Sequence, residues 1–239
     1  NEFLKKIKIP FDWFIEDLII LKPTSKPVAL AENIDLDNNF KDFVNETMCA
    51  FDTGIKKIET ETKTLNEFFG EDKENIDRLT KILNDNPSQR VVLHSNRGEE
   101  VIAVNENGKL LIKRLVFLHL SDKNEYIEFY LNEESDGTNR LLDYLPAFQD
   151  IIYGSKVYVI DEVERSIHPL LIKELINKYS KDENTKGQLI FTTHESNILD
   201  QDILRQDEIW FIEKDHNGCS DMYPLSEFKE HHTKSIKKG

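Results

Sequence analysis

The feature that most constrains the fold is an alternation of short apolar segments with helical patterns between residues 132 and 225. The apolar segments are expected to be buried strands, and the amphipathic segments between them helices. Strands are expected at Lys156–Ile160, Gln188–Thr192 and Glu208–Ile212, and helices at Thr138–Tyr153 and Ser166–Tyr179. Buried strands that alternate with helices are typical of a parallel sheet with flanking helices. The sequence therefore predicts an α/β fold for this part of the chain.

Two regions with other patterns precede it. Residues 1–87 are expected to be mostly helical, as an insertion or arm with one short strand at Ile55–Glu61. Residues 88–131 contain apolar runs separated by turn signals such as Asn107-Gly108, and they predict an antiparallel β meander. Its strands are expected at Val91–His94, Val101–Asn105, Lys109–Leu120 and Tyr126–Tyr130. The α/β lobe then occupies residues 132–228, and residues 229–239 form a basic tail that we expect to be frayed.

Composition restricts the class of protein. The net charge of −14 argues against a broad phosphate-binding surface on this piece, although nucleic-acid binding through other regions stays compatible with it. Only two cysteines are present, which suggests a reducing compartment. No apolar run approaches the roughly 18 residues of a membrane span, and no signal peptide is seen at the start. We therefore expect a cytoplasmic chain, and, since it does not begin with Met, a piece of a longer protein.

The strongest chemical motif is Asp161-Glu162, which follows the apolar segment VYVI. Ligands in open α/β folds bind at the carboxyl ends of the strands, where these two acids are expected. In P-loop NTPases the first acid of such a pair helps to hold Mg²⁺, and in ABC-type members the second orients the attacking water. The ordinary alternative is a core strand that ends in a solvated acidic turn.

A second motif, Thr192-Thr193-His194-Glu195, follows the next predicted strand, and His194 lies 32 residues after Glu162. A histidine one strand away from the two acids is placed to hydrogen-bond a γ-phosphate. The alternative is a turn histidine that caps the next helix.

A third motif opens the helix before the acidic strand and consists of Ser135, Asp136, Gly137 and Thr138. A helix N-terminus presents free N–H groups and the positive end of its dipole to an anion. In ABC ATPases the signature motif occupies this place and binds the γ-phosphate held by the opposite subunit. Ser135 and Thr138 are also ordinary N-cap residues, so a purely structural role is the alternative.

The residues after the acid pair, which include Ser166 and His168, stand where ABC ATPases carry the D-loop that crosses the dimer interface. Pro169 fits the first turn of the following helix. His168 is expected to be a cap or interface residue rather than a catalytic one.

The order of these motifs resembles the second half of an ABC-type ATPase head, and specifically the AAA15-type (RloA-like, abortive-infection) ATPases, which are related to OLD and SMC heads. The matching segments are EESDGTNRLLDYLP, VYVIDEVERSIHPLL, GQLIFTTHESNILD and LRQDEIWFIEKDHNG, over about residues 133–228, with FVNETMCAFDTGI matching more loosely. The family usually has Leu-His-Pro after its acid pair, whereas this chain has Ile167-His168-Pro169.

The resemblance implies ATP and Mg²⁺ as cofactors and a role in bacterial anti-phage defence. It implies Asp161 as the Mg²⁺ acid, Glu162 as the general base and His194 as the switch histidine. Ser135 and Gly137 would be signature residues that act in trans in a nucleotide-sandwich dimer or higher oligomer. Hydrolysis at the dimer interface would gate an effector, such as a nuclease or toxin.

The phosphate-gripping loop GxxxxGK[ST] is missing, because no pair of the chain's nine glycines has the required spacing before Gly-Lys-Ser/Thr. We therefore expect the loop to come from a preceding segment or another chain, and this piece alone to be inactive.

Two other functions are open. The chain could be a non-hydrolysing scaffold or sensor head. It could also be a metal-dependent nuclease module of the OLD type, for which Asp35-Leu36-Asp37 is a candidate DxD pair.

Overall fold

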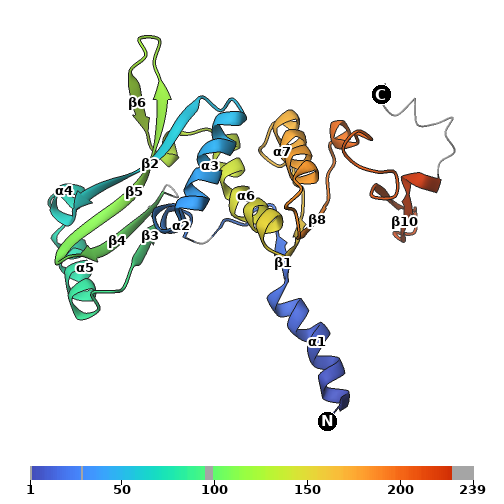
Figure 1. Cartoon of the computed structure of the whole chain (residues 1–239), viewed down its shortest axis with the longest axis horizontal. Coiled ribbons are helices and arrows are strands. Elements are labelled where there is room, and N and C mark those ends of the chain that lie inside the picture. Colours follow the sequence, from blue (N-terminus) through green and yellow to red (C-terminus); the bar gives the residue numbers. More distant parts are fainter. Residues whose placement is uncertain (1, 28, 95–98, 228–239) are drawn as a thin grey trace.

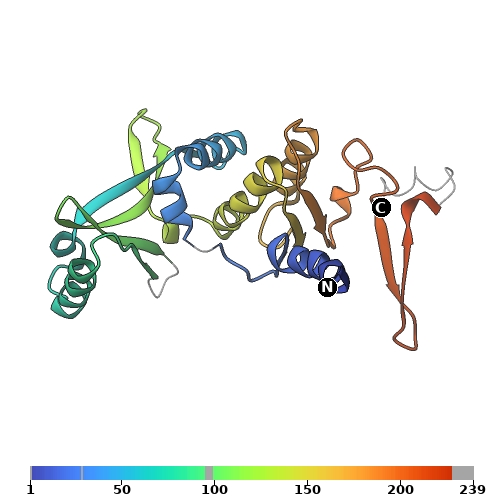
Figure 2. The same cartoon turned by 60° about the horizontal axis from the view of Figure 1, so that its bottom comes forward.

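The computed structural model describes residues 2–27, 29–94 and 99–227 (Figure 1). Figure 2 shows three parts along the molecule: an antiparallel sheet with its helices, a central α/β lobe, and a small hairpin near the C-terminal end. The expected tail at 229–239 and the turn at 95–98 lie outside the described residues. No helix among the described residues is long and apolar enough to cross a membrane.

The α/β fold class is confirmed by a three-stranded parallel sheet. Its central strand β7 (Val157–Ile160) pairs with β1 (Leu18–Leu21) on one side and with β8 (Gln188–Phe191) on the other. β7 and β8 were expected from the sequence, but β1 was not. The segment LIIL is short and follows a helix, α1 (Glu2–Glu16), so its strand character depends on pairing with β7.

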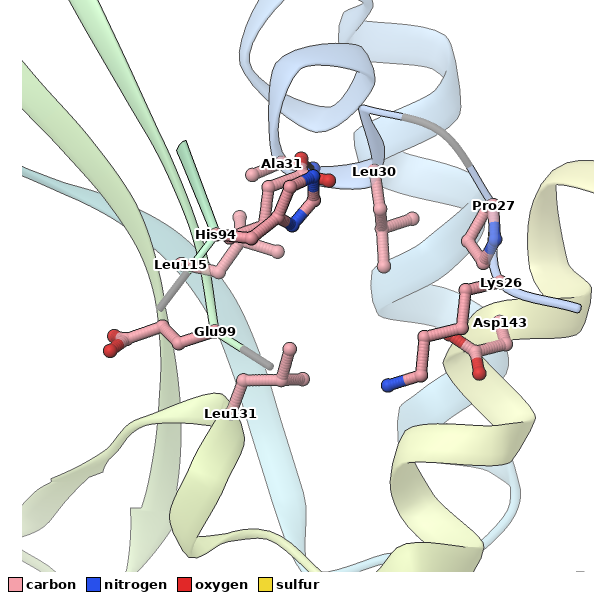
Figure 3. A pocket seen from close by; sticks show the side chains of 10 residues that line it. Lys26, Pro27, Leu30, Ala31, His94, Glu99, Leu115, Leu131 and Asp143 are labelled. Atoms are coloured by element: carbon pink, nitrogen blue, oxygen red, sulfur yellow. Dashed lines mark hydrogen bonds between the residues drawn. The ribbon is translucent and has the colours of Figure 1, made fainter. Parts of the chain in front are cut away.

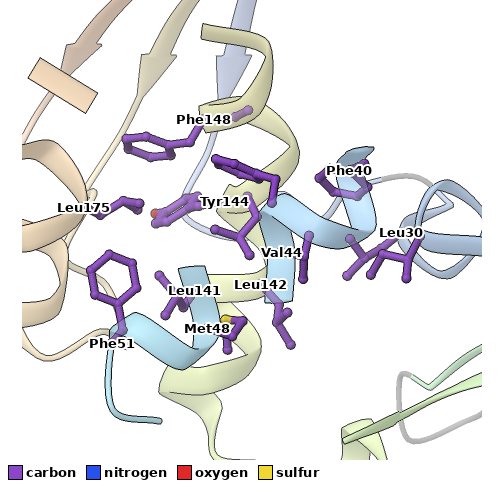
Figure 4. Close-up of a cluster of buried hydrophobic side chains, with 14 of the residues drawn as sticks. Leu30, Phe40, Val44, Met48, Phe51, Leu141, Leu142, Tyr144, Phe148 and Leu175 are labelled. Atoms are coloured by element: carbon purple, nitrogen blue, oxygen red, sulfur yellow. The ribbon is translucent and has the colours of Figure 1, made fainter. Parts of the chain in front are cut away.

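Helices α6 (Asp136–Tyr153) and α7 (Pro169–Lys181) pack on one face of this sheet. The row Ile19, Tyr158 and Leu189 contributes to the resulting core. In Figure 4 the side chains of α6 meet those of α3 (Asn38–Ala50), with Leu141 and Leu142 close to Met48. The main core of the chain thus joins the central lobe to the helices beside it.

The opposite face of the parallel sheet is less covered within the described chain. The row Ile20, Val159 and Ile190 lies on that face, and Ile20 and Ile190 are 60% and 48% exposed. Parallel sheets are normally covered on both faces. β8 is also an edge strand, with β7 as its single partner among the described strands.

The antiparallel meander is confirmed. It comprises β3 (Val91–His94), β4 (Glu100–Glu106), β5 (Lys109–Leu120) and β6 (Tyr126–Phe129). A further strand from the first region, β2 (Ile55–Thr64), is longer than expected and pairs with β5. Region 1–87 therefore contributes a strand to each of the two larger sheets, besides its helices.

Helices cover both faces of the antiparallel sheet. α4 (Leu65–Phe69) and α5 (Lys73–Asp85) pack on one face, around Val101, Ala103 and Ile112. α2 (Leu30–Leu36) and α3 lie on the other, where Ile102 and Val104 join the main core. The alternation along β4 sends successive side chains to the two cores, as the period of a strand requires.

The expectation that Glu208–Ile212 forms a buried strand of the parallel sheet is wrong. The segment forms β9 (Trp210–Lys214), which pairs antiparallel with β10 (Ser220–Pro224) in a separate hairpin. Trp210 and Ile212 are more than half exposed. An apolar alternating segment fits either a buried or an edge position, and the turn at Gly218 pairs it with its own neighbour.

The short 3₁₀ segments are Leu131–Glu133, Ser196–Ile198 and Leu225–Glu227.

Candidate active site

Asp161 and Glu162 lie directly after β7, at the carboxyl edge of the parallel sheet. The Asp161 N–H donates to the Leu21 carbonyl at 3.0 Å, which extends the pairing with β1 by one residue. Glu162 then has a φ of 49°, a left-handed conformation that is uncommon for a residue with a side chain. This turn follows directly on the end of β7 at Ile160.

Thr192 joins the two acids to the end of β8. Its hydroxyl donates to Asp161 Oδ1 at 2.6 Å and accepts the Glu162 N–H at 2.9 Å. The Val163 N–H donates to the Thr192 carbonyl at 3.1 Å. The acid turn and the segment that carries His194 are therefore held together by side-chain and backbone bonds.

Glu164 makes a second link between the same two segments. Its Oε1 accepts the His194 N–H at 2.9 Å. Burial raises the pKa of the Glu164 carboxyl, but the His194 N–H and the Thr193 hydroxyl lower it by more, so this pKa lies below its usual range. Glu164 is consequently a carboxylate that holds the backbone of His194. The residue His194 itself is exposed.

Ser135 is the N-cap of α6, which is the structural role that the sequence left open as the alternative. Its Oγ accepts the Thr138 N–H at 3.1 Å and lies 2.9 Å from the Thr138 hydroxyl. Ser135 and Asp136 are exposed, whereas Thr138 is buried and serves the cap. A Cβ added to Gly137 would lie 3.0 Å from the Ser166 carbonyl, so a glycine lets α6 approach the turn after the acids.

The two residues expected in the D-loop, Ser166 and His168, make different contacts. Ser166 is exposed and has a φ of 64°, and its carbonyl faces Gly137. His168 is the N-cap of α7, and its Nδ1 accepts the Leu170 N–H at 3.3 Å. This contact is the cap role that the sequence allowed for His168. The structure thus brings the acid turn, the His194 segment and the start of α6 to one end of the sheet.

Sequence reasoning missed three residues that support this site: Thr192, Glu164 and Arg140. Arg140 is buried in α6 and donates to the Ser25 carbonyl at 2.6 Å and to the Tyr144 hydroxyl at 3.0 Å. It thereby fixes α6 to the segment that follows β1. Thr192 and Glu164 stood inside the motifs, but their partners come from another strand, which no local pattern reveals.

A pocket lies away from this site, between α6 and the antiparallel sheet (Figure 3). Lys26 and Asp143 project into it from the same side. Burial raises the pKa of Asp143 to about 6, although Lys26 and Arg140 act to lower it. None of the acids or histidines expected to act on a ligand line this pocket.

The residues present at the sheet edge fit a Mg²⁺–nucleotide. Asp161 is exposed and engages Thr192 through Oδ1, so its carboxylate still offers oxygen to a cation, and Mg²⁺ prefers such oxygen ligands. Glu162 is half-buried beside it, with Arg165 Nη1 3.5 Å from its Oε2. A hydroxyl, two carboxylates and a histidine around one edge suit the positioning of a phosphate and a water.

The fold and these residues define the chain's class. It belongs to the family described as AAA domain, putative AbiEii toxin, Type IV TA system, whose model matches residues 6–200. It is also 30% identical over 223 residues to endonuclease GajA of Bacillus cereus (strain HuB5-5). That match covers 79% of this chain and 29% of GajA, so the chain spans less than a third of that relative.

Proposed function

We propose that this chain is the hydrolysing half of an ABC-type ATPase related to the AAA15-type, OLD and SMC heads. The observation that carries the proposal is the bridge from Thr192 to both Asp161 and Glu162. It holds two acids at the carboxyl edge of a parallel sheet in a family of AAA domains. The bridge fixes the carboxylate of the first acid and the backbone of the second, as a site for a metal ion and a positioned water requires.

Each residue then has a role in the proposed reaction. Asp161 would hold Mg²⁺, which when bound neutralises charge on the β- and γ-phosphates. Glu162 would orient and deprotonate the attacking water. His194 would hydrogen-bond the γ-phosphate, and Ser135, Asp136, Gly137 and Thr138 would present the start of α6 to the nucleotide of a second subunit.

The phosphate-gripping loop would be supplied by a segment that covers the exposed sheet face or pairs with β8. The exposed side chains of Ile20 and Ile190 support this assignment, because covering them removes apolar area from water. The β8 edge offers backbone groups to a further parallel strand. This chain by itself would bind ATP poorly.

The wider role is part of the proposal. Two such heads would sandwich ATP between them, with Ser166 and His168 close to the contact between subunits. The description of the family as putative AbiEii toxin and the resemblance to abortive-infection ATPases support a bacterial anti-phage defence system in the cytoplasm, in which hydrolysis would gate an effector. Contact with nucleic acid would use other regions, because the net charge of this chain is −14.

Glu162→Gln in the full-length protein tests the proposal. The amide cannot take a proton from water, so the ATP turnover number should fall by about 10²- to 10⁴-fold. ATP should still bind, and the ATP-bound assembly should last longer in size-exclusion chromatography. The measurement is phosphate release together with the assembly state.

Glu174→Gln is the matched control, because Glu174 is an exposed carboxylate on α7 away from the acid turn. It should leave turnover unchanged. Normal turnover by the Glu162→Gln protein would sink the role proposed for Glu162. Absence of ATP turnover by the wild-type full-length protein would favour the non-hydrolysing scaffold or sensor head.

The nuclease alternative is favoured only by the name of the relative GajA. Within this chain, Asp35 is engaged by Lys113 and Arg90, and Asp37 caps α3 by accepting the Asn39 N–H at 2.9 Å. Both acids of the DxD pair thus have structural partners. Metal-dependent cleavage of DNA or RNA by this chain would revive this alternative.

A further inference from the structure

Glu164 occupies an unusual place between the two segments of the site. It follows Glu162 by two residues, and its carboxylate turns back to the segment after β8. Oε1 accepts the His194 N–H at 2.9 Å, while Oε2 is buried. The Thr193 hydroxyl also bonds to this carboxylate. Glu164 therefore contacts the side chain of Thr193 and the backbone of His194.

Strand pairing does not reach His194. The last paired residues of the two strands are Ile160 and Phe191. The Thr192 N–H still donates to the Ile160 carbonyl at 3.0 Å, but His194 lies two residues further along. Its backbone N–H is fixed by Glu164 rather than by the sheet. The position of the His194 backbone, from which the ring extends, therefore depends on a side chain from the acid turn.

We propose that Glu164 is a positioning residue that sets the distance between His194 and the Glu162 carboxylate during hydrolysis. The catalytic consequence of this inference rests on the proposed function. The bracing is reciprocal, because Thr192 extends from the His194 segment to the acids and Glu164 extends from the acid turn to His194. Two opposed links between the same segments restrict both sliding and separation.

Glu164 itself is not placed to act on a ligand. Its carboxylate is used by the neighbouring segment, and its second oxygen is buried, whereas Asp161 and His194 are exposed at the edge. A charged acceptor strengthens the bond to the His194 N–H relative to a neutral one. Loss of the acceptor should therefore leave ATP binding largely intact and misplace the phosphate-sensing ring.

The experiment compares Glu164→Ala with Glu164→Gln in the full-length protein. Glu164→Ala should lower kcat for ATP about 10- to 100-fold, with little change in KM, because misplacing a reacting group acts on the chemical step. Glu164→Gln keeps an oxygen that accepts the His194 N–H and should restore most of kcat. Glu174→Ala is the control for removal of an exposed glutamate and should not change either constant.

Amide hydrogen exchange of the segment 192–197 gives a readout that does not need ATP turnover. In Glu164→Ala the His194 amide should exchange about tenfold faster than in the wild type, and in Glu164→Gln close to the wild-type rate. If the wild-type protein does not hydrolyse ATP, the proposed function fails, but the exchange still tests the bracing. Unchanged exchange, or a Gln variant as impaired in kcat as the Ala variant, would overturn the inference.

Discussion

The hydroxyl of Thr192 lies 2.6 Å from Asp161 Oδ1, and the same oxygen accepts the Glu162 N–H at 2.9 Å. One side chain thus fixes the carboxylate of the first acid and the backbone of the second. The left-handed conformation of Glu162 is held partly by this bond.

Thr192→Val, which is similar in shape but has no hydroxyl, should lower ATP turnover of the full-length protein about 10- to 100-fold, because the acid turn loses its link to β8. Thr192→Ser keeps the hydroxyl and should retain most of the turnover. Steady-state phosphate release measures both. Equal turnover of the Val and Ser variants would contradict the role given to the hydroxyl.

Arg140 should make a large contribution to stability. Its buried guanidinium donates to the Ser25 carbonyl at 2.6 Å and lies over the Tyr144 ring at 4.4 Å from the centroid. Arg140→Ala should lower the free energy of unfolding by about 2–4 kcal/mol, because the carbonyls lose their donor and the packing is lost. Urea denaturation followed by circular dichroism measures the change.

Arg78→Ala is the control for Arg140, because Arg78 is an exposed arginine on α5. Its effect should stay within about 0.5 kcal/mol. Arg140→Lys should rescue the Ala variant only in part, since an ammonium cannot reproduce the planar fork of donors. Full rescue by Lys would show that charge alone matters at this position.

The buried carboxyl of Asp143 should make the free energy of unfolding depend on pH. Burial raises its pKa from 3.8 to about 6 in the folded protein. Between these two values the folded state binds more protons than the unfolded state, so the free energy of unfolding should fall as pH rises through this window and level off above it. Asp143→Asn should remove this slope and stabilise the protein at pH 7 by on the order of 2 kcal/mol.

Urea denaturation midpoints at pH 4.5, 6 and 7.5 measure the Asp143 effect. Asp77→Asn, an exposed position on α5, should keep the wild-type difference between these pH values. A wild-type slope that persists in the Asp143→Asn protein would assign the pH dependence to another group.

The sequence by itself determined the elements with local signals. The strand before Asp161, the helix capped by Ser135 and the strand before Thr192 each follow from apolar pattern and cap chemistry within a few residues. The meander followed from its turn residues. These signals need no knowledge of distant partners, so the order of motifs that indicated the family was readable directly.

Tertiary structure decided what depends on partners far along the chain. The segment LIIL forms β1 because it pairs with β7. Trp210–Lys214 pairs with β10 and not with the parallel sheet. The links of Thr192 to the acid turn and of Glu164 to His194 span about thirty residues of sequence. Strand register and side-chain hydrogen bonds between strands are set when the sheet assembles, and a local pattern does not encode them.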